Sequence, residues 1–315
     1  MKGLGYQENC LPKYQKKVLK ENLEGDVIFY TSERNFPFAN YESTYIKLLG
    51  QRIGLAGIDK EFDVKLIKTK PFFESVSRCL CLFNPFHLYK TIKRERIDVI
   101  HLHGATNLNV VSLVIISFFL DFKLFIDCHA DENNSKVTSK ANKFFYFFLT
   151  YFYKVFNGKV NKFLPVAKSC QKYLATELDI PVEKTEITPL CFDSEYMFYD
   201  HTLAEKLRLD MTSDQNTTFL GYFGKISPEK NVLESLMIFA GVKQLLKNKS
   251  LKFLIVGNGD SEYKKEIQEY IKDNGLTEFV VFIPMQKREG LRGYLSLCKV
   301  AFWIGSASNC IQEAM

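Results

Sequence analysis

Short apolar runs alternate with longer segments of helical periodicity over the first two thirds of the chain. Residues 98–102 (DVIHL) form a short β-branched run that is typical of a strand, whereas 107–120 is long enough for a helix. Alternation of this kind predicts a parallel sheet covered by helices on both faces. We expect strands at 26–31, 62–67, 98–102, 123–127, 162–167 and 186–190, and helices at 41–52, 85–95, 107–120, 139–156 and 169–177.

The alternation stops in a polar, irregular stretch at 193–216 and then starts again. We expect a connection between domains there, containing a helical pattern at 204–209. Beyond it, strands are expected at 218–223, 251–256, 278–283 and 300–304, and helices at 231–247, 261–274, 289–298 and 309–315. The prediction is an α/β fold with two Rossmann-like, doubly wound domains, 1–195 and 217–315, joined by a linker over 196–216.

Composition excludes several classes of protein. The chain has 315 residues, of which 46% are hydrophobic and 25% charged, so it can bury a large core and is not expected to be disordered. A net charge of +6, spread along the chain, is too small for a dedicated nucleic-acid binder. The eight cysteines include no CxxC pair, which argues against a structural zinc site. The N-terminus has no apolar secretory segment, so we expect a cytoplasmic protein.

Two apolar stretches, 105–120 and 144–156, bear on membrane contact. Both are shorter than the roughly 18–20 residues that a spanning helix needs. The first is interpreted as a helix buried in a large domain. The second, FFYFFLTYFYKVF, is edged by lysines, and the pattern leaves open a core helix and a helix lying on a membrane surface. We expect residues 142–164, together with the aromatic and basic residues of 83–96, to form a surface that contacts a membrane peripherally.

Candidate chemistry follows the strands of the second half. Lys225 and Lys230 lie in a loop that begins at Gly224 and leads into a helix. Two ammonium groups beside a helix N-terminus suit a diphosphate, although a solvated turn with surface lysines fits the same pattern. After the next strand, the Gly257–Asn258–Gly259 segment allows close backbone approach, but it lacks the third glycine of a dinucleotide-binding fingerprint.

Further candidates lie in both halves. Ser308 or Asn309 is expected to cap a helix in which Glu313, one turn along, reaches a ligand hydroxyl or its own helix N-terminus. In the first half, His103 and His129 each follow a strand and are placed to face the crevice between domains. Buried structural histidines remain an alternative for both. No Asp-x-Asp triplet for a metal-bound nucleotide sugar occurs.

Taken in order, these pieces resemble the family 4 (group 1) retaining glycosyltransferases, which have the GT-B architecture. The second half carries GYFGKISPEKN, LKFLIVGNGD, EFVVFIPM and the final EAM, and the first half carries DVIHLHG, IDCHAD and LPVAKS. The resemblance implies a nucleotide-sugar donor bound by the second domain and an acceptor bound by the first.

By this resemblance, Lys225 and Lys230 bind the donor diphosphate, and Gly224 is part of the donor site. Glu313, which with His129 is a candidate catalytic residue, binds ribose hydroxyls. His129 lies near the transferred sugar, and His103 lies on the acceptor side. Other residues expected to line the donor site are Gly257, Asn258, Gly259, Pro284, Met285, Ser308 and Asn309. The resemblance also implies retaining transfer without metal or cofactor, with leaving phosphate oxygen helping to take the acceptor proton.

The chain departs from the family pattern at several positions. Gly305 occupies the place of the family's first acidic residue, Lys225 replaces its usual arginine, and residues 35–40 replace its glycine-rich loop. The family also continues beyond the position of Met315, so we expect an incomplete second domain. The function expected is hexose transfer to a glycan or lipid-linked acceptor in surface-polysaccharide or glycolipid assembly. A GT-B nucleotide-sugar epimerase and a non-catalytic nucleotide-sugar-binding protein are the alternatives.

Overall fold

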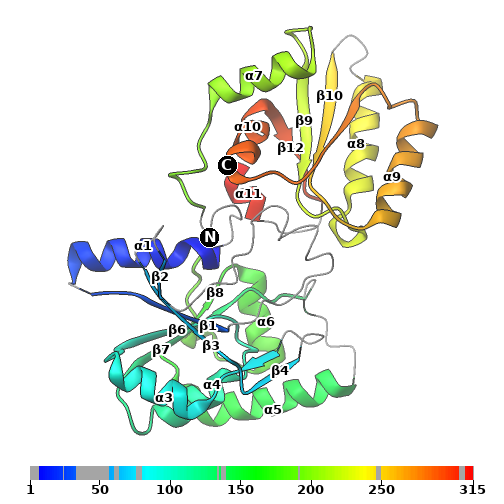
Figure 1. Cartoon of the computed structure of the whole chain (residues 1–315). Coiled ribbons are helices and arrows are strands. Elements are labelled where there is room, and N and C mark those ends of the chain that lie inside the picture. Colours follow the sequence, from blue (N-terminus) through cyan, green and yellow to red (C-terminus); the bar gives the residue numbers. More distant parts are fainter. Residues whose placement is uncertain are drawn as a thin grey trace.

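The computed structural model describes residues 7–23, 25–32, 57–59, 64–75, 80–132, 135, 140–190, 192–245, 250–304 and 309–314. The chain is a mixed α/β protein of two Rossmann-like halves (Figure 1). The buried apolar residues form one cluster in the first half, between Leu88 and Ile180, and two in the second, between Ala204 and Leu297.

Within the described part of the first half, the strands form separate small sheets. One has the order β1-β3-β2 with β2 antiparallel, another is the parallel sheet β6-β7-β8, and β4 pairs with β5. The strands are β1 (Ile28–Ser32), β2 (Gly57–Asp59), β3 (Val64–Thr69), β4 (Phe73–Ser75), β5 (Leu80–Leu82), β6 (Val99–Leu102), β7 (Lys123–Cys128) and β8 (Lys162–Pro165). The helices are α1 (Gln7–Asn22), α3 (Pro85–Arg94), α4 (Asn109–Ile116), α5 (Lys140–Phe156) and α6 (Lys168–Leu178).

The second half contains one parallel sheet with the order β11-β10-β9-β12. Its strands are β9 (Thr218–Phe223), β10 (Leu251–Val256), β11 (Val280–Ile283) and β12 (Cys298–Ala301), and its helices are α7 (His201–Met211), α8 (Val232–Leu245), α9 (Ser261–Asp273), α10 (Arg288–Leu297) and α11 (Asn309–Ala314). In chain order this is strand order 3-2-1-4, as in a Rossmann half, so the order reverses between β9 and β12. The predicted fold class is confirmed.

Most predicted elements occur within a few residues of their expected bounds, and the strand at 186–190 is the exception. Beyond one bridge from Thr185 to Phe163, this segment makes only two backbone hydrogen bonds to β8, from Glu186 N–H and Thr188 N–H. Pro165 in β8 has no N–H to donate back to this segment, which interrupts the ladder. The predicted helix at 41–52 and the loop at 35–40 lie outside the described residues.

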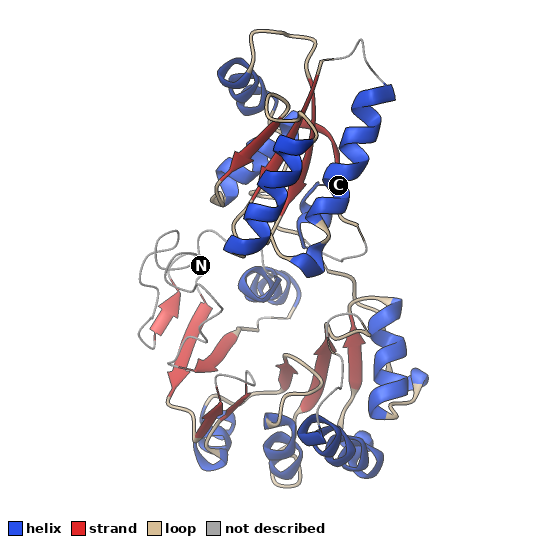
Figure 2. Ribbon diagram, turned by 90° about the vertical axis from the view of Figure 1, so that its right-hand side faces the viewer, coloured by secondary structure: helices blue, strands red, loops and turns tan. Residues whose placement is uncertain are grey.

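Helix α1 was not expected from the polar start of the chain. It lies beside the connection between the halves, where Tyr14 and Lys13 contact Asp193 and Glu195. The helical segment expected at 204–209 lies within α7, which packs on α10. Figure 2 shows that the strands of the β6-β7-β8 sheet and those of the second half point toward each other, so their carboxyl ends lie on facing sides.

Candidate functional site

The reversal of strand order between β9 and β12 places the donor-side candidates together. In open α/β sheets, ligands bind beyond the carboxyl ends of the strands at such a reversal. The loop after β9 and the segment after β12 meet there: Asn231 Nδ2 donates to the Ile304 carbonyl at 2.9 Å, and Trp303 Nε1 donates to the Phe223 carbonyl at 2.8 Å. The backbone at this edge is therefore fixed by the protein itself.

The glycines at this edge allow two loops to touch. A Cβ on Gly257 would lie 1.8 Å from the Gly224 carbonyl oxygen, and one on Gly259 would lie 1.9 Å from that of Ile226. Gly224 has a φ of 145°, a conformation that favours glycine. We expected Gly257 and Gly259 to allow a ligand to approach, but the close approach that the structure shows is between the loops after β9 and β10.

The two candidate lysines lie in the loop after β9. Lys225 is 61% exposed, and its Nζ lies 3.0 Å from Glu229 Oε1. Lys230 is half-buried and ends a short 3-10 turn, Pro228–Lys230, just before α8. The largest influence on Glu229 is its own backbone N–H, which with Lys225 lowers the pKa of this carboxyl to about 2. Both lysines are thus at the predicted edge, and Lys225 has an anionic partner.

The remaining donor-side candidates follow β10 and β11. Asn258 accepts from Gly259 N–H at 2.9 Å and from Lys264 Nζ, so its side chain is held by α9. Lys264 adds a cation that sequence reasoning missed, and burial lowers its pKa. Pro284 and Met285 directly follow β11, with Pro284 exposed and Met285 half-buried.

Glu313 lies in α11 with its carboxylate turned into the protein. Its Oε1 is buried without a hydrogen-bond partner among the described residues. Burial raises the pKa of Glu313 to about 7, while Arg288 and Cys310 act in the opposite direction. Asn309 begins α11, whereas Ser308 and Gly305 lie outside the described residues. A carboxylate of this kind is suited to accept a hydrogen bond from a ligand hydroxyl.

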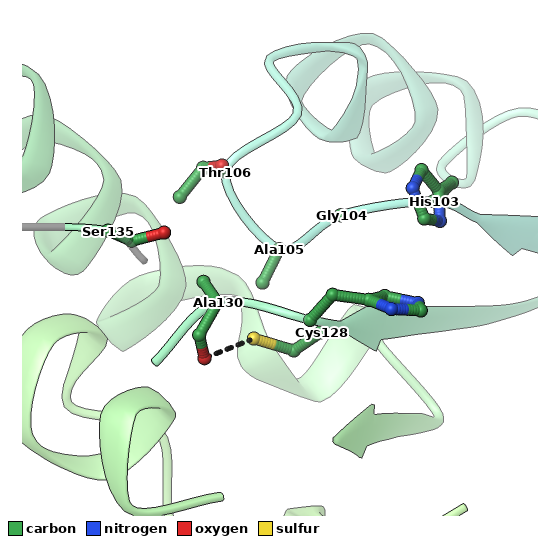
Figure 3. Close-up of a pocket in the computed structure, with 8 residues that line it drawn as sticks. His103, Gly104, Ala105, Thr106, Cys128, Ala130 and Ser135 are labelled. Atoms are coloured by element: carbon green, nitrogen blue, oxygen red, sulfur yellow. Dashed lines mark hydrogen bonds between the residues drawn. The ribbon is translucent and has the colours of Figure 1, made fainter. Parts of the chain in front are cut away.

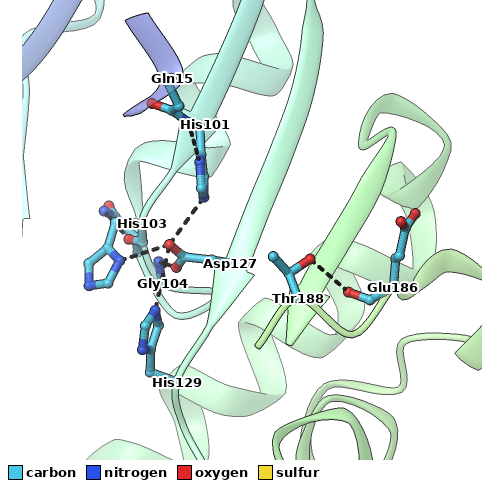
Figure 4. Close-up of polar contacts among 9 residues, drawn as sticks. Gln15, His101, His103, Gly104, Asp127, His129, Glu186 and Thr188 are labelled. Atoms are coloured by element: carbon cyan, nitrogen blue, oxygen red, sulfur yellow. Dashed lines mark hydrogen bonds and ion pairs between the residues drawn. The ribbon is translucent and has the colours of Figure 1, made fainter. Parts of the chain in front are cut away.

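In the first half, imidazoles gather around one buried carboxylate at the ends of β6 and β7 (Figure 4). Asp127 Oδ2 lies 2.9 Å from His103 Nδ1, 3.1 Å from His101 Nε2 and 3.7 Å from His129 Nε2. The Gly104 N–H donates to Asp127 Oδ1 at 2.7 Å. Because β6 and β7 are adjacent and parallel, residues that end both strands meet at one edge.

The electrostatics of Asp127 follow from these contacts. Burial alone raises the pKa of this carboxyl, but the hydrogen bonds from His101 and His103, with His129 Nε2 3.7 Å away, outweigh it and hold the pKa far below its ordinary value. Asp127 is therefore ionised throughout the ordinary pH range and can only accept hydrogen bonds. Sequence reasoning named His103 and His129 and missed Asp127, although the IDCHAD motif contains it.

A cavity of about 290 Å³ opens beside this cluster. Figure 3 shows its lining, which comes from the loops after β6 and β7. Its lining residues are His103, Gly104, Ala105, Thr106, Cys128, His129, Ala130 and Ser135. The side chain of His103 is 55% exposed and that of His129 is 27% exposed. Small molecules can therefore reach both imidazoles.

This cluster also satisfies the simplest geometric test for a metal site. His103, Asp127 and His129 each offer one ligand atom, all within 4.8 Å of one another. The carboxylate is, however, already hydrogen-bonded through both of its oxygens, by His103, His101 and Gly104. The described contacts thus satisfy Asp127 without an ion.

Another buried carboxylate, Asp193, joins the two halves and was also missed. Its side chain is fully buried, accepts from Tyr14 Oη, and lies 3.2 Å from Arg288 Nη1 and 3.7 Å from Lys13 Nζ. Burial opposes ionisation, but these donors lower the pKa of Asp193 below its ordinary value. Because Arg288 also acts on Glu313, one buried cation links the donor edge to the connection between the halves.

Helix α5 is apolar on both of its faces. Leu149, Phe152 and Tyr153 are buried in the core of the first half. The opposite side exposes Phe144, Phe147, Phe148, Tyr151 and Val155, with exposed fractions between 42% and 74%. None of the described helices has the length and apolar content needed to cross a membrane. The core-helix interpretation thus describes the buried side of α5, and the membrane-surface interpretation concerns its exposed side.

Comparisons with known proteins agree with this architecture. The model of Glycosyltransferase Family 4 matches residues 23–196, more than half of the chain, and that of Glycosyl transferases group 1 matches residues 204–306. No curated protein matches the chain in sequence.

Among solved structures, the glycosyltransferase from Rickettsia africae ESF-5 aligns over 94% of this chain and 68% of its own, with a TM-score of 0.64 and 12% identity. Anabaena HepE in complex with UDP aligns over 95% of this chain and 71% of its own, with a TM-score of 0.58 and 16% identity. A putative UDP-N-acetylglucosamine 2-epimerase from Listeria monocytogenes aligns over 95% and 72%, with a TM-score of 0.50 and 11% identity. These likenesses concern the fold, and the family matches identify the chain as a glycosyltransferase that belongs to Glycosyltransferase Family 4.

Proposed function

We propose that this glycosyltransferase moves a hexose-type sugar from a nucleotide-sugar donor to a glycan or lipid-linked acceptor in surface-polysaccharide or glycolipid assembly. The observation that carries the proposal is the arrangement at the reversal of strand order, where Lys225 and Lys230 lie in the loop that leads into α8. A diphosphate there meets two ammonium groups and the positive end of a helix.

The chemistry follows from where charge develops. Breaking the bond between the sugar and its phosphate leaves negative charge on the diphosphate, and lysines fixed in advance stabilise it without a metal. In this proposal Glu313 accepts a hydrogen bond from a ribose hydroxyl, and His129 lies near the transferred sugar. HepE, a structural neighbour, was solved with UDP, which supports a uridine nucleotide as the first donor to test.

We propose that the transfer retains the anomeric configuration, with attack on the same face from which the diphosphate leaves. Product anomers from transfer to a simple glycan acceptor, resolved by proton NMR, test this directly. An inverted anomer in the initial product would contradict it.

The main experiment is transfer of labelled sugar from a panel of UDP- and GDP-sugars, with EDTA present in a parallel series. We expect transfer that EDTA does not change. A nucleotide sugar that is converted without any acceptor would instead indicate an epimerase, an activity named for one structural neighbour. Nucleotide binding without turnover would indicate a non-catalytic binding protein, and neither binding nor turnover would contradict the proposal.

We also propose that the exposed face of α5 lies on an anionic membrane surface, together with the basic residues of α3. No Asp or Glu occurs between Glu132 and Glu177, whereas lysines recur throughout that interval. The exposed aromatic residues of α5 have helical spacing, and Figure 1 shows α3, α4 and α5 at the same edge of the first half. Phe86 on α3 is 79% exposed, while Phe83 packs against Tyr30.

Sedimentation with vesicles tests the surface. We expect the chain to bind vesicles of mixed phosphatidylcholine and phosphatidylglycerol, and salt to weaken the binding because lysines contribute to it. The triple variant Phe144→Ser, Phe147→Ser and Tyr151→Ser should lose binding. Leu245→Ser, at an exposed apolar position in α8, is the control. Equal binding by the triple variant and the wild type would show that α5 is not the contact.

A further inference from the structure

Helix α1 contacts the segment that connects the two halves. Tyr14 Oη donates to Asp193 Oδ1, and Lys13 Nζ pairs with Glu195 and lies 3.7 Å from Asp193. Burial, together with Asp193, raises the pKa of Tyr14 to about 12, so the hydroxyl keeps the proton that it donates. The whole of α1 precedes residue 23, where the family match begins, so that match does not account for these contacts.

Helix α1 is fixed to the first half by its other contacts. The Lys16 side chain is nearly buried, and its Nζ lies 3.1 Å from Asp26 Oδ1, two residues before β1. Gln15 Nε2 reaches His101 Nδ1 in β6 at 3.5 Å, and α1 also packs on β3. Groups of the connection that α1 holds are therefore held to the first half.

The same carboxylate of the connection also holds the second half. Arg288, which begins α10, places its Nη1 3.2 Å from Asp193 Oδ2, and both side chains are buried. One turn further along α10, Arg292 Nη1 donates to the Tyr196 carbonyl at 3.1 Å, and its Nη2 lies 3.0 Å from Asp200 Oδ2. Asp193 thus binds α1 through one oxygen and α10 through the other.

An aromatic ring of the connection is shared in the same way. Lys13 Nζ and the Arg288 guanidinium carbon each lie 5.3 Å from the centre of the Tyr196 ring, within the range of a cation–π contact. One of these cations comes from each half. A buried carboxylate is costly unless its charge is compensated, so the arrangement in which both halves contribute a donor to Asp193 is favoured.

We propose that α1 is a strap that holds the second half in its working orientation against the first half, and that Asp193 is a positioning residue for sugar transfer. This inference rests on the proposed function, in which the second half binds the donor and the first half binds the acceptor. The strands of the β6-β7-β8 sheet and those of the second half point toward each other (Figure 2). The orientation of the halves therefore decides whether the acceptor oxygen meets the anomeric carbon.

The first test removes only the α1 side of the network. Arg288 also acts on Glu313, so a change at Arg288 would alter the donor edge directly. The double variant Lys13→Ala, Tyr14→Phe leaves Asp193 and Arg288 paired. It should lower kcat by about 10- to 10²-fold, since a displacement of about 1 Å between reacting groups has an effect of that size. The Kd for UDP, measured by calorimetric titration, should not change.

Two further proteins sharpen this test. Lys17→Ala, Tyr199→Phe changes an exposed lysine of α1 and an exposed tyrosine of the connection, and it should keep the wild-type kcat. Tyr14→Phe alone keeps the ring and loses only the hydroxyl, so it serves if the double variant does not fold. A network that only stabilised the fold would lower the thermal midpoint and leave the kcat of the folded protein unchanged.

A charge exchange tests the pairing itself. Lys13→Glu places an anion beside Asp193 and Glu195, and it should lower kcat more than Lys13→Ala does. Adding Glu195→Lys to Lys13→Glu restores a pair of opposite charges between α1 and the connection. The exchanged protein should recover part of the lost kcat, because residues that contact each other have effects that do not add.

Small-angle X-ray scattering of the full chain tests the orientation without a substrate. The double variant Lys13→Ala, Tyr14→Phe should have a larger radius of gyration than the wild type, with the same far-ultraviolet circular dichroism. If the wild type transfers sugar and this variant keeps its kcat, the strap proposal is wrong. Equal losses of kcat and UDP affinity also overturn it. If the wild type neither binds UDP nor transfers sugar, the proposed function fails, and scattering still decides whether α1 holds the two halves.

Discussion

Two carboxylates, one in each half of the protein, occupy opposite electrostatic environments. Asp127 lies in the first half among His101 and His103, and these contacts hold its pKa far below the ordinary value despite burial. Glu313 lies in the second half, where burial raises its pKa to about 7 and its Oε1 has no hydrogen-bond partner within the described residues. Among the described residues, the hydrogen bonding of the first carboxylate is complete, whereas Oε1 of the second has no donor.

This difference indicates that the two halves are organised for different events. A fully bonded carboxylate has a fixed geometry before any ligand arrives, which is what a positioning group needs. A desolvated carboxylate with an open acceptor gains most from a ligand hydroxyl, because the hydrogen bond offsets part of its burial cost. Residues whose environments move their pKa values apart often have distinct roles in one reaction.

The largest expected effect comes from Asp127→Ala. Removing the carboxylate leaves the partly buried N–H groups of His101 and Gly104 without an acceptor, and each such group costs about 1–3 kcal/mol. Because the pKa of Asp127 is lowered in the folded protein, its contribution is present above the ordinary Asp pKa of about 3.9 and is lost as the pH falls.

Urea denaturation at pH 7 measures this loss, and Asp121→Ala at an exposed position is its control. A loss below about 1 kcal/mol would show that the imidazoles find other partners, and the contrast with Glu313 would disappear.

The next effect in size concerns the cations of the donor side. Lys230→Ala should lower kcat/KM by about 10²- to 10³-fold, since removing one preorganised donor to a developing negative charge has that effect. Lys265→Ala, a surface lysine of α9 paired with Glu262, should have little effect. An unchanged rate for Lys230→Ala would show that this lysine has no part in the mechanism. The proposed donor site would then lose the main observation on which it rests.

The arrangement of the second half was readable from the sequence because each strand there is a short apolar run followed by a polar loop. The 218–223, 251–256 and 278–283 patterns all became parallel strands, since buried parallel strands are apolar throughout. The short strands β2, β4 and β5 were not predicted, because three-residue strands have too little pattern to detect. Helix α1 was missed because its place depends on distant contacts such as Tyr14 with Asp193.

The sequence predicted where the candidate residues lie in the fold, but it did not predict which side chains they contact. Strand ends located His103, Lys225 and Glu313, since ligands bind where parallel strands end. The sequence could not show that Asp127 is shared by neighbouring imidazoles, or that Glu229 pairs with Lys225. Such contacts depend on rotamers and on strand register, which a local pattern does not determine.

A third, smaller effect tests the other carboxylate of the comparison. Because the pKa of Glu313 is raised to about 7 in the folded protein, burying its charged form costs stability as the pH rises from about 4.5 through 7. Glu313→Gln should therefore be more stable than the wild type at pH 8, by up to about 3 kcal/mol, and about equal to it at pH 5.

The same variant should bind the donor nucleotide less tightly, because an amide oxygen is a weaker acceptor for a ribose hydroxyl than a carboxylate. Thermal unfolding at both pH values and calorimetric titration with UDP measure the two effects. A variant that is less stable at pH 8 would show that Glu313 is already satisfied in the folded protein.

The smallest effect is expected at Glu229, an exposed carboxylate that contrasts with both buried ones. Its carboxylate and Lys225 Nζ are 3.0 Å apart, but each side chain is 61% exposed. Water screens such a pair, so despite the lowered pKa of Glu229 the pair contributes only about 0–1 kcal/mol. Glu229→Gln should therefore leave the thermal midpoint nearly unchanged.

The same variant, Glu229→Gln, should strengthen UDP binding by a few-fold, because Lys225 no longer has a competing anion beside the diphosphate. Lys225→Ala should weaken UDP binding. Calorimetric titration at low and at high salt separates the electrostatic part of this loss from the part that is due to the shape of the side chain. Weaker UDP binding by Glu229→Gln would mean that Glu229 holds Lys225 in its binding position, and exposure would then be a poor guide to which carboxylates matter at this edge.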